Sequence, residues 1–281
     1  MHVVVTIAGS DSSAGAGIQA DLKTVAACGA YAACVVTSIT AQTPDAVHAS
    51  FVLPATLVRA QLDAAVDAFP VGAVKTGMLA NVEIVECVAQ ALNALQPRHF
   101  VLDPVMVSES GSPLLAADAI DCLRRQLLPL ASVVTPNRHE MQALTGVDVA
   151  GPDAAEAAGR RLLDLGCGAV LVKGGHFDRA RGTDVLVTTA GCDRFATPEL
   201  ASRSTHGTGC TLSAAIATFL ARGFELAEAI RAAKRYTTAA IRDGLVWGAP
   251  VGPTDHFFFL RRDTARWIDT LNLHDAREDS P

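Results

Sequence analysis

Short runs of β-branched residues alternate along this chain with alanine-rich stretches whose apolar residues recur at helical spacing. The first runs predict a strand at residues 3–8, a helix at 18–28 and a strand at 31–38. Further strands are predicted at residues 73–76, 99–102, 133–135 and 169–173, and further helices at 55–69, 82–95, 154–165, 209–221 and 226–242. Strands that alternate with helices predict an α/β fold with a mostly parallel central sheet and helices on both faces. Such a sheet binds its ligands at the carboxyl ends of the strands.

The rest of the chain gives no sign of a second domain. Residues 184–188 and 192–197 flank Thr189-Ala190-Gly191 and predict a hairpin appended to the parallel core. No internal repeat, low-complexity tract or Pro/Ser-rich linker divides the sequence. We therefore expect one domain over residues 1–275, followed by a polar, frayed tail at residues 276–281.

Composition narrows the range of partners. The 281 residues carry a formal net charge of −6, with a pI near 5.7, 5% aromatic residues and no Lys/Arg-dense tract, which argues against nucleic acid. No unbroken apolar run reaches the ~20 residues of a membrane span. The seven cysteines form no C-x-x-C pair or zinc-ligand cluster, and the first residues lack the features of a secretory signal. We expect a cytoplasmic protein that binds a small molecule and no membrane.

A glycine-rich loop lies between the first predicted strand and the first predicted helix. Its residues Gly15-Ala16-Gly17-Ile18-Gln19-Ala20 match the pattern G-x-G-x-x-[GA] of dinucleotide sites, but the acidic residue expected ~20 positions later is missing. The Walker pattern G-x-x-x-x-G-K-[ST] is also absent. The loop is therefore explained equally well by ligand binding or by a tight turn that needs small residues.

A second glycine motif precedes the helix predicted at residues 209–221. Gly207, Thr208, Gly209 and Cys210 place a glycine turn at a helix start, where free amides and the positive end of the helix dipole stabilise phosphate oxygens. The same field is expected to lower the pKa of the Cys210 thiol, which makes this group a candidate proton acceptor. The alternative is a small-residue turn with a buried structural cysteine.

Polar residues follow four of the predicted strands, and a parallel sheet would bring them to one rim. They are Lys75-Thr76-Gly77-Met78, Asp103-Pro104-Val105-Met106, Thr135-Pro136-Asn137-Arg138-His139-Glu140 and Lys173-Gly174-Gly175-His176. There, Asp103 and Glu140 could hold Mg²⁺ and Lys173 could neutralise phosphate charge. Glu140 also follows Asn137 by three residues, so it could merely complete a helix-capping arrangement.

Six segments together resemble the hydroxymethylpyrimidine/phosphomethylpyrimidine kinases of thiamine biosynthesis over roughly residues 3–259. The segments are residues 9–21, Ala41-Gln42, residues 102–106, Thr135-Pro136-Asn137, residues 172–176 and residues 205–211. The glycine turn alone is typical of the wider ribokinase-like superfamily, in which Asp usually occupies the position of Cys210. The cysteine and the Ala41-Gln42 pair look like the pyrimidine kinases, with some pyridoxal kinases as close relatives.

The resemblance implies a ribokinase-like three-layer sandwich, usually a homodimer, that uses Mg·ATP for two successive transfers. The first transfer goes onto the hydroxymethyl oxygen of the aminopyrimidine, and the second onto the resulting monophosphate. Gln42 would hydrogen-bond the pyrimidine, and Cys210 would face the acceptor. The remaining implied contacts are Gly9, Ala16, Met78 and Val105 around the pyrimidine, and Lys173, Thr135, Asn137 and Thr208 around the nucleotide.

The sequence departs from the family at one place and leaves other functions open. The family usually has a Gly-His-Gly-Pro run near its C-terminus, where this chain has Gly248-Ala249-Pro250-Val251-Gly252-Pro253-Thr254-Asp255-His256. This departure concerns the C-terminal loop and the preference for a substrate. The alternatives are a pyridoxal kinase, a non-catalytic pyrimidine-sensing module and a dinucleotide oxidoreductase.

Overall fold

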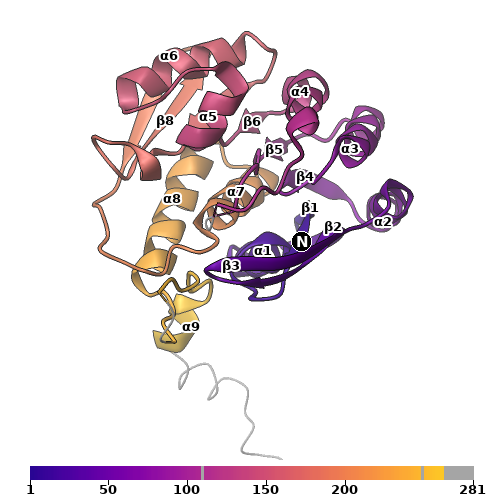
Figure 1. The fold of residues 1–281 in the computed structure, drawn as a ribbon, viewed down its shortest axis with the longest axis horizontal. Helices are drawn as coiled ribbons and strands as arrows, with labels where there is room; N and C mark the ends of the chain where they lie inside the picture. Colours follow the sequence, from indigo (N-terminus) through magenta and orange to yellow (C-terminus); the bar gives the residue numbers. More distant parts are fainter. Residues whose placement is uncertain (109–110, 248–249, 263–281) are drawn as a thin grey trace, which may run out of the picture.

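The computed structural model describes residues 1–108, 111–247 and 250–262, and within them one sheet forms the centre of the molecule (Figure 1). Its strands are β1 Val3–Asp11, β2 Tyr31–Thr43, β3 Ala46–Val52, β4 Val71–Thr76, β5 Phe100–Leu102, β6 Val133–Val134, β7 Ala169–Val172, β8 Thr183–Thr188 and β9 Cys192–Ala196. The spatial order is β3-β2-β1-β4-β5-β6-β7-β8-β9. The predicted tail at residues 276–281 lies outside the described residues.

Most of the sheet is parallel, as predicted. Strands β2, β1, β4, β5, β6 and β7 pair in parallel, whereas β3 runs antiparallel to β2 at one edge. At the other edge, β8 is antiparallel to β7, and β9 completes the predicted hairpin. The central strands are buried on both faces, which explains their near-continuous apolar sequences.

Helices cover both faces of the sheet (Figure 1). They are α1 Gly17–Ala27, α2 Ala55–Ala68, α3 Val82–Leu95, α4 Ala117–Gln126, α5 Arg138–Thr145, α6 Pro152–Leu163, α7 Thr208–Ala221, α8 Leu226–Arg242 and the short α9 Phe258–Arg262. Helices α2 to α6 pack in sequence over one face and share a hydrophobic core with it. Helices α1, α7 and α8 cover the opposite face around a second core.

Helix α7 has the most buried position among the helices on its face. It contacts α1, α8 and strands β1, β4 and β5, and residues on all its sides are buried, including Leu212, Ala215 and Ile216. A helix that is apolar all round is stabilised by burial rather than by a single amphipathic face. This packing sets the beginning of α7 beside the carboxyl ends of the central strands, where an α/β sheet binds its ligands.

The predicted strands and helices are all present, with shifts of a few residues at their ends. Strand β2 extends to Thr43, five residues beyond the predicted end, because its last part pairs with β3. Four of these strands and α-helices were not predicted, namely β3, α4, α5 and α9. Strand β3 is mostly exposed, and α5 has only eight residues, so neither has a strong periodic apolar pattern.

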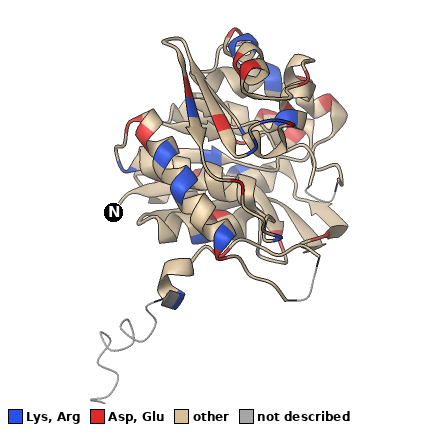
Figure 2. Ribbon diagram, turned by 90° about the vertical axis from the view of Figure 1, so that its left-hand side faces the viewer, with Lys and Arg blue, Asp and Glu red and all other residues tan. Residues whose placement is uncertain are grey.

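Figure 2 shows basic and acidic residues distributed over the elements on one side of the molecule. Helix α8 is mostly basic, with Arg231, Lys234, Arg235 and Arg242 against one acidic residue, Glu228. No helix among the described residues is both long enough and apolar enough to cross a membrane.

Candidate active site

The glycine turn at the beginning of α7 has a backbone that other residues do not readily adopt. Gly207 caps the helix with a φ of +84°, in the left-handed region that favours glycine. An added Cβ on Gly207 would lie 1.8 Å from the carbonyl oxygen of Gly15. Thr208 Oγ1 donates a hydrogen bond of 2.6 Å to the Thr205 carbonyl and braces the turn. The first amides of α7 lack partners within the helix, and they can therefore meet an anion.

Lys173 brings positive charge to this turn. Its Nζ lies 3.4 Å from the position that a Cβ on Gly209 would occupy. The same ammonium is 2.9 Å from Asp103 Oδ1 and 3.7 Å from Glu140 Oε2. Asp103, Glu140 and Lys173 follow three different strands, and the parallel sheet brings them together at one rim.

Asp103 is almost fully buried and well supplied with donors. Besides Lys173, the Thr135 hydroxyl donates to Oδ1 at 3.2 Å and the Ser213 hydroxyl donates to Oδ2 at 2.9 Å. Burial alone would raise the pKa of Asp103, but the ammonium groups of Lys173 and Lys75 outweigh it and hold the pKa below its usual value. This carboxylate is therefore ionised at neutral pH.

Glu140 has a helix-capping role as well as its place beside Lys173. The Asn137 side-chain oxygen accepts a hydrogen bond from the backbone N–H of Glu140 at 3.0 Å. In return, the Glu140 carboxylate accepts one from the backbone N–H of Asn137 at 2.7 Å. This capping box begins α5. Burial raises the pKa of Glu140 to about 7, with the charge of Asp103 adding to the effect and Lys173 opposing it.

The expected lowering of the Cys210 pKa is wrong. Burial raises the pKa of this thiol to about 11, and the charge of Lys75 opposes only part of the shift. Lys75 is fully buried, and its Nζ is 2.8 Å from both carboxylate oxygens of Asp21. The Asp21 carboxylate therefore neutralises much of the positive charge of Lys75. Loss of hydration therefore outweighs the helix field at Cys210, and the sulfur carries its proton at neutral pH.

The residues expected around a pyrimidine lie on β1, β2, the beginning of α1 and the segments after β4 and β5. A Cβ on Gly9 would lie 3.0 Å from the Met78 sulfur, so these two residues are neighbours. Ala16 caps α1, and Val105 follows Asp103 by two residues. Gln42 is half-buried on β2, where its side-chain oxygen accepts from Thr40 at 3.1 Å.

The dinucleotide-like loop packs against the chain itself at both of its motif glycines. An added Cβ on Gly15 would lie 2.2 Å from the imidazole Cδ2 of His206, and one on Gly17 would lie 2.3 Å from the Gly9 carbonyl oxygen. A dinucleotide site uses the second glycine of the pattern, here Gly17, to let the pyrophosphate approach the backbone, and in this fold the Gly9 carbonyl occupies that space. This loop therefore gives the oxidoreductase alternative no structural support.

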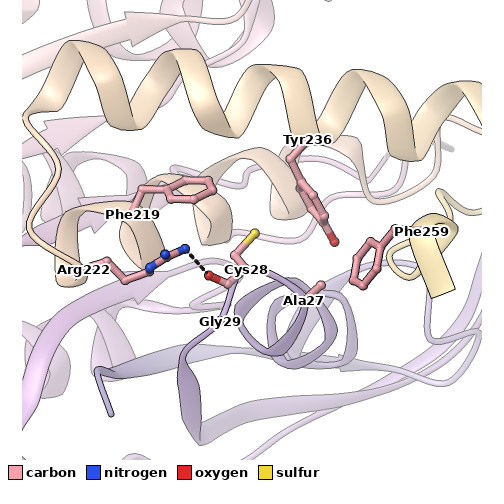
Figure 3. A pocket seen from close by; sticks show the side chains of 7 residues that line it. All are labelled: Ala27, Cys28, Gly29, Phe219, Arg222, Tyr236 and Phe259. Carbon is pink, nitrogen blue, oxygen red and sulfur yellow. Dashed lines mark hydrogen bonds between the residues drawn. The ribbon is translucent and has the colours of Figure 1, made fainter. Parts of the chain in front are cut away.

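A surface cavity of about 360 Å³ lies away from the glycine turn, beside the ends of α1 and α7 (Figure 3). It is lined by Ala27, Cys28, Gly29, Phe219, Arg222, Tyr236 and Phe259. Cys28 and Arg222 follow the carboxyl ends of α1 and α7, so the cavity is at the edge of the sheet where β2 begins, opposite the strand ends described above. The Arg222 guanidinium donates to the Cys28 carbonyl at 2.7 Å and lies over the Phe219 ring.

Sequence reasoning gave no role to several residues that shape the site. Ser213 lies one helical turn after Gly209 and Cys210, on α7, and this spacing could have indicated that its side chain shares their face. The Asp21–Lys75 pair has no local signal, because its members are 54 residues apart. Asp11 and His206 lie in the two glycine motifs, but only the fold shows that they meet.

A mostly parallel α/β sheet whose strand ends hold a lysine, buried carboxylates and a glycine turn at a helix start defines a small-molecule kinase of the ribokinase-like fold. The chain belongs to the phosphomethylpyrimidine kinase family, whose family model matches residues 11–255. It is 44% identical to the hydroxymethylpyrimidine/phosphomethylpyrimidine kinase of Escherichia coli, over 90% of this chain and 96% of that protein.

Two further comparisons extend this result. The chain is 46% identical to the bifunctional thiamine biosynthesis protein ThiED of Geobacter sulfurreducens, over 90% of this chain and 52% of that protein, so it spans about half of that relative. Among solved structures, an ADP complex of Bacillus subtilis pyridoxal kinase superposes with a TM-score of 0.86 and 39% identity, covering 92% of this chain and 98% of that one.

Proposed function

We propose that this chain uses ATP to phosphorylate 4-amino-5-hydroxymethyl-2-methylpyrimidine to its monophosphate and then to its diphosphate, in thiamine biosynthesis. The observation that carries the proposal is the position of the Lys173 ammonium. It lies beside both the glycine turn of α7 and the buried Asp103 carboxylate. The 44% identity to the E. coli kinase over nearly its whole length supports the pyrimidine as the acceptor.

In this proposal the transferring phosphate rests on the turn formed by Gly207, Thr208 and Gly209. Phosphoryl transfer has a loose transition state, so positioning and charge stabilisation contribute more than proton removal. The backbone amides of the turn position the phosphate, and Lys173 neutralises charge that develops on its oxygens. Cys210 faces the acceptor, and as a neutral thiol it can hydrogen-bond the hydroxyl oxygen.

Asp103 and Glu140 would hold Mg²⁺ together with the phosphates of the nucleotide. Within the described ranges, no group of three or more His, Cys, Asp and Glu side chains converges. Two buried carboxylates on either side of one ammonium fit the usual Mg²⁺ site, in which one or two carboxylates and substrate phosphates supply the oxygens. The ion would supply charge neutralisation at the phosphates. Thr135, Asn137 and Thr208 would face the nucleotide.

The acceptor pocket would be formed by Gly9, Ala16, Met78 and Val105, with Gln42 as the polar partner of the aminopyrimidine. Gln42 is suited to this role because its amide carries both a donor and an acceptor, as does the edge of an aminopyrimidine. The close approach of Met78 to Gly9 gives the pocket an apolar wall. Specificity would then arise from one paired polar edge within an apolar slot.

The proposal includes a homodimer, a cytoplasmic location and one kinase domain over residues 1–275. Ile39 and Phe51 pair across β2 and β3 and are 53% and 65% exposed, and a second subunit could cover this apolar surface. All seven cysteines are free thiols, which suits a reducing compartment.

Pyridoxal is the second candidate acceptor, because the pyridoxal kinase of B. subtilis superposes with a TM-score of 0.86. The test is an ATP-coupled assay with hydroxymethylpyrimidine, its monophosphate, pyridoxal and ribose. We expect both pyrimidines to be phosphorylated and ribose not to be phosphorylated. Phosphorylation of pyridoxal but of neither pyrimidine would make pyridoxal the acceptor in place of the pyrimidine. Pyrimidine binding without ATP consumption would indicate a sensing module instead.

A further inference from the structure

The loop at residues 11–17, here called the Asp11 loop, packs directly on the glycine turn at residues 205–210. A Cβ on Gly15 would lie 2.2 Å from the His206 ring, and one on Gly207 would lie 1.8 Å from the Gly15 carbonyl. Glycine fits on both sides of this contact because the His206 ring fills the space beside Gly15 and the Gly15 carbonyl fills the space beside Gly207. The candidate acceptor pocket and the candidate phosphate turn therefore share one interface.

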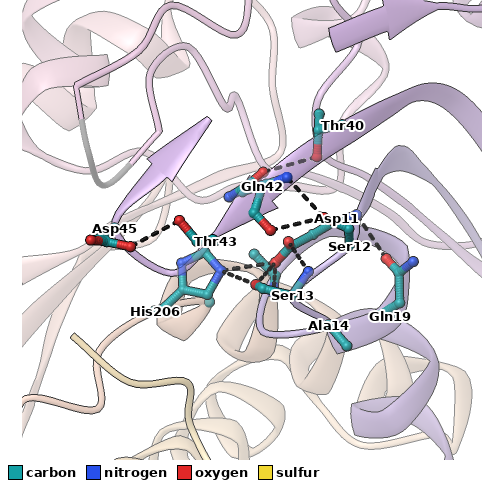
Figure 4. A network of polar contacts seen from close by, with 12 residues as sticks. Asp11, Ser12, Ser13, Ala14, Gln19, Thr40, Gln42, Thr43, Asp45 and His206 are labelled. Carbon is teal, nitrogen blue, oxygen red and sulfur yellow. Dashed lines mark hydrogen bonds and ion pairs between the residues drawn. The ribbon is translucent and has the colours of Figure 1, made fainter. Parts of the chain in front are cut away.

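Asp11 and His206 form the polar centre of that interface (Figure 4). His206 Nε2 is 2.8 Å from Asp11 Oδ2, and both side chains are only 3–4% exposed. The same carboxylate accepts from the Ser13 and Ala16 amides, each at 2.8 Å, and thereby folds the Asp11 loop. Burial opposes the ionisation of Asp11, but the hydrogen bonds from His206, Ala16 and Ser13 hold its pKa below the usual value.

The network also reaches Gln42 on β2. The Ser12 hydroxyl donates a hydrogen bond to the backbone carbonyl of Gln42 at 2.8 Å and accepts one from the backbone N–H of Gln42 at 2.8 Å. Ser12 is the neighbour of Asp11 in sequence, and His206 is the neighbour of Gly207. A continuous path therefore runs from the backbone of Gln42 through Asp11 to His206, which precedes Gly207 in the turn (Figure 4).

We infer that Asp11 and His206 are positioning residues that hold the phosphate turn at a fixed distance from the acceptor pocket. The inference rests on the proposed function, because it takes Gln42 as the contact for the acceptor and the turn as the contact for the phosphate. The pair fixes the distance between two loops that lie nearly 190 residues apart in the sequence.

The energetic reason is the sensitivity of group transfer to distance. Reacting atoms must approach to about 3–3.5 Å in a near-attack geometry, and a displacement of 1 Å can lower the rate about 10²-fold. The turn and the Asp11 loop are connected covalently only through nearly 190 residues of chain. Their register therefore depends on noncovalent contacts, of which the Asp11–His206 pair is the buried, charge-assisted one.

The test compares His206→Ala, which removes the ring, with His206→Gln, whose amide can still donate to Asp11. The control is Asp45→Asn, an exposed carboxylate at the margin of the same network, where it accepts from Thr43. We expect His206→Ala to lower kcat about 10²-fold while KM for the acceptor changes less than about threefold. His206→Gln should recover most of the lost kcat, and Asp45→Asn should match the parent enzyme.

A double-mutant cycle with Asp11→Asn determines whether the two residues act as a unit. If they do, the double variant loses about as much kcat as the worse single variant. Additive losses, or a loss from His206→Ala that His206→Gln leaves uncorrected, would overturn the inference.

Amide hydrogen exchange in the ligand-free protein gives a readout that is independent of the acceptor. His206→Ala should speed exchange in both the Asp11 loop and the turn, whereas faster exchange in the turn alone would contradict the inference. If the parent enzyme phosphorylated no pyrimidine but exchange still rose in both segments, the proposed function would fail and the positional coupling would stand.

Discussion

Replacement of Gly207 by alanine tests the contact on which the geometry of the proposed phosphate turn depends. A non-glycine residue at φ +84° costs about 1–2 kcal/mol in strain. In addition, the new Cβ would lie 1.8 Å from the Gly15 carbonyl oxygen, whereas real contacts of this kind are at least 3.0 Å. The turn and the Asp11 loop must therefore separate by about 1.2 Å.

Gly223 provides the matched control at the other end of the same helix. Its φ is +89°, and an added Cβ there would meet nothing within 4 Å. Gly223→Ala should therefore show the strain alone, about 1–2 kcal/mol in the free energy of unfolding, with unchanged kcat. Gly207→Ala should lose more stability and lower kcat about 10²-fold, because the turn is displaced by more than 1 Å.

The two variants are compared by urea denaturation and by steady-state turnover under saturating substrates. Two results would refute the reasoning. One is an equal loss of stability in both variants, which would mean that the collision with Gly15 is relieved at no cost. The other is Gly207→Ala turnover within about threefold of the parent enzyme, which would mean that the register of the turn is not limiting.

Three further predictions concern single side chains. Gln42→Ala should weaken acceptor binding by about 1–3 kcal/mol while leaving ATP affinity unchanged, as measured by calorimetry; the opposite pattern would place the two subsites the other way round. Without Mg²⁺, the free energy of unfolding should fall as the pH rises from 4.5 to about 7, because Glu140 keeps a proton in the folded protein that it releases in the unfolded chain. Denaturation midpoints measured across this pH range should show the fall, and Glu140→Gln should flatten it. Cys210→Ala should keep measurable turnover, whereas Gly209→Val should abolish it; equal, mild losses would contradict the assigned roles.

The order of strands and helices could be predicted because most elements have a local pattern. Central strands are buried on both faces, and α3 and α8 have apolar residues at helical spacing between polar ones. Strand β3 has no buried face, and it exists because β2 offers it backbone partners. Helix α4 buries only Ala119, Cys122 and Leu123, which is too few to stand out from its charged residues.

The candidate site could be predicted only as far as topology alone determines it. Residues that follow parallel strands meet at one rim, so Asp103, Glu140 and Lys173 could be placed together before their distances were known. Their partners could not be placed. Ser213 and the Asp21–Lys75 pair reach the site through packing between α1, α7 and the sheet, and no local pattern records such packing.

The pKa of Cys210 shows why a helix start alone is a weak guide to thiol chemistry. The packing around the beginning of α7 removes water from the Cys210 sulfur, and the dehydration of a charged thiolate costs more free energy than the helix field contributes. Lys75 could have compensated, but both oxygens of Asp21 bind its ammonium. A neutral thiol is compatible with phosphoryl transfer, because a loose transition state demands little removal of the acceptor proton before the phosphate moves. In the proposed function, the turn and Lys173 would therefore contribute more to catalysis than a base would.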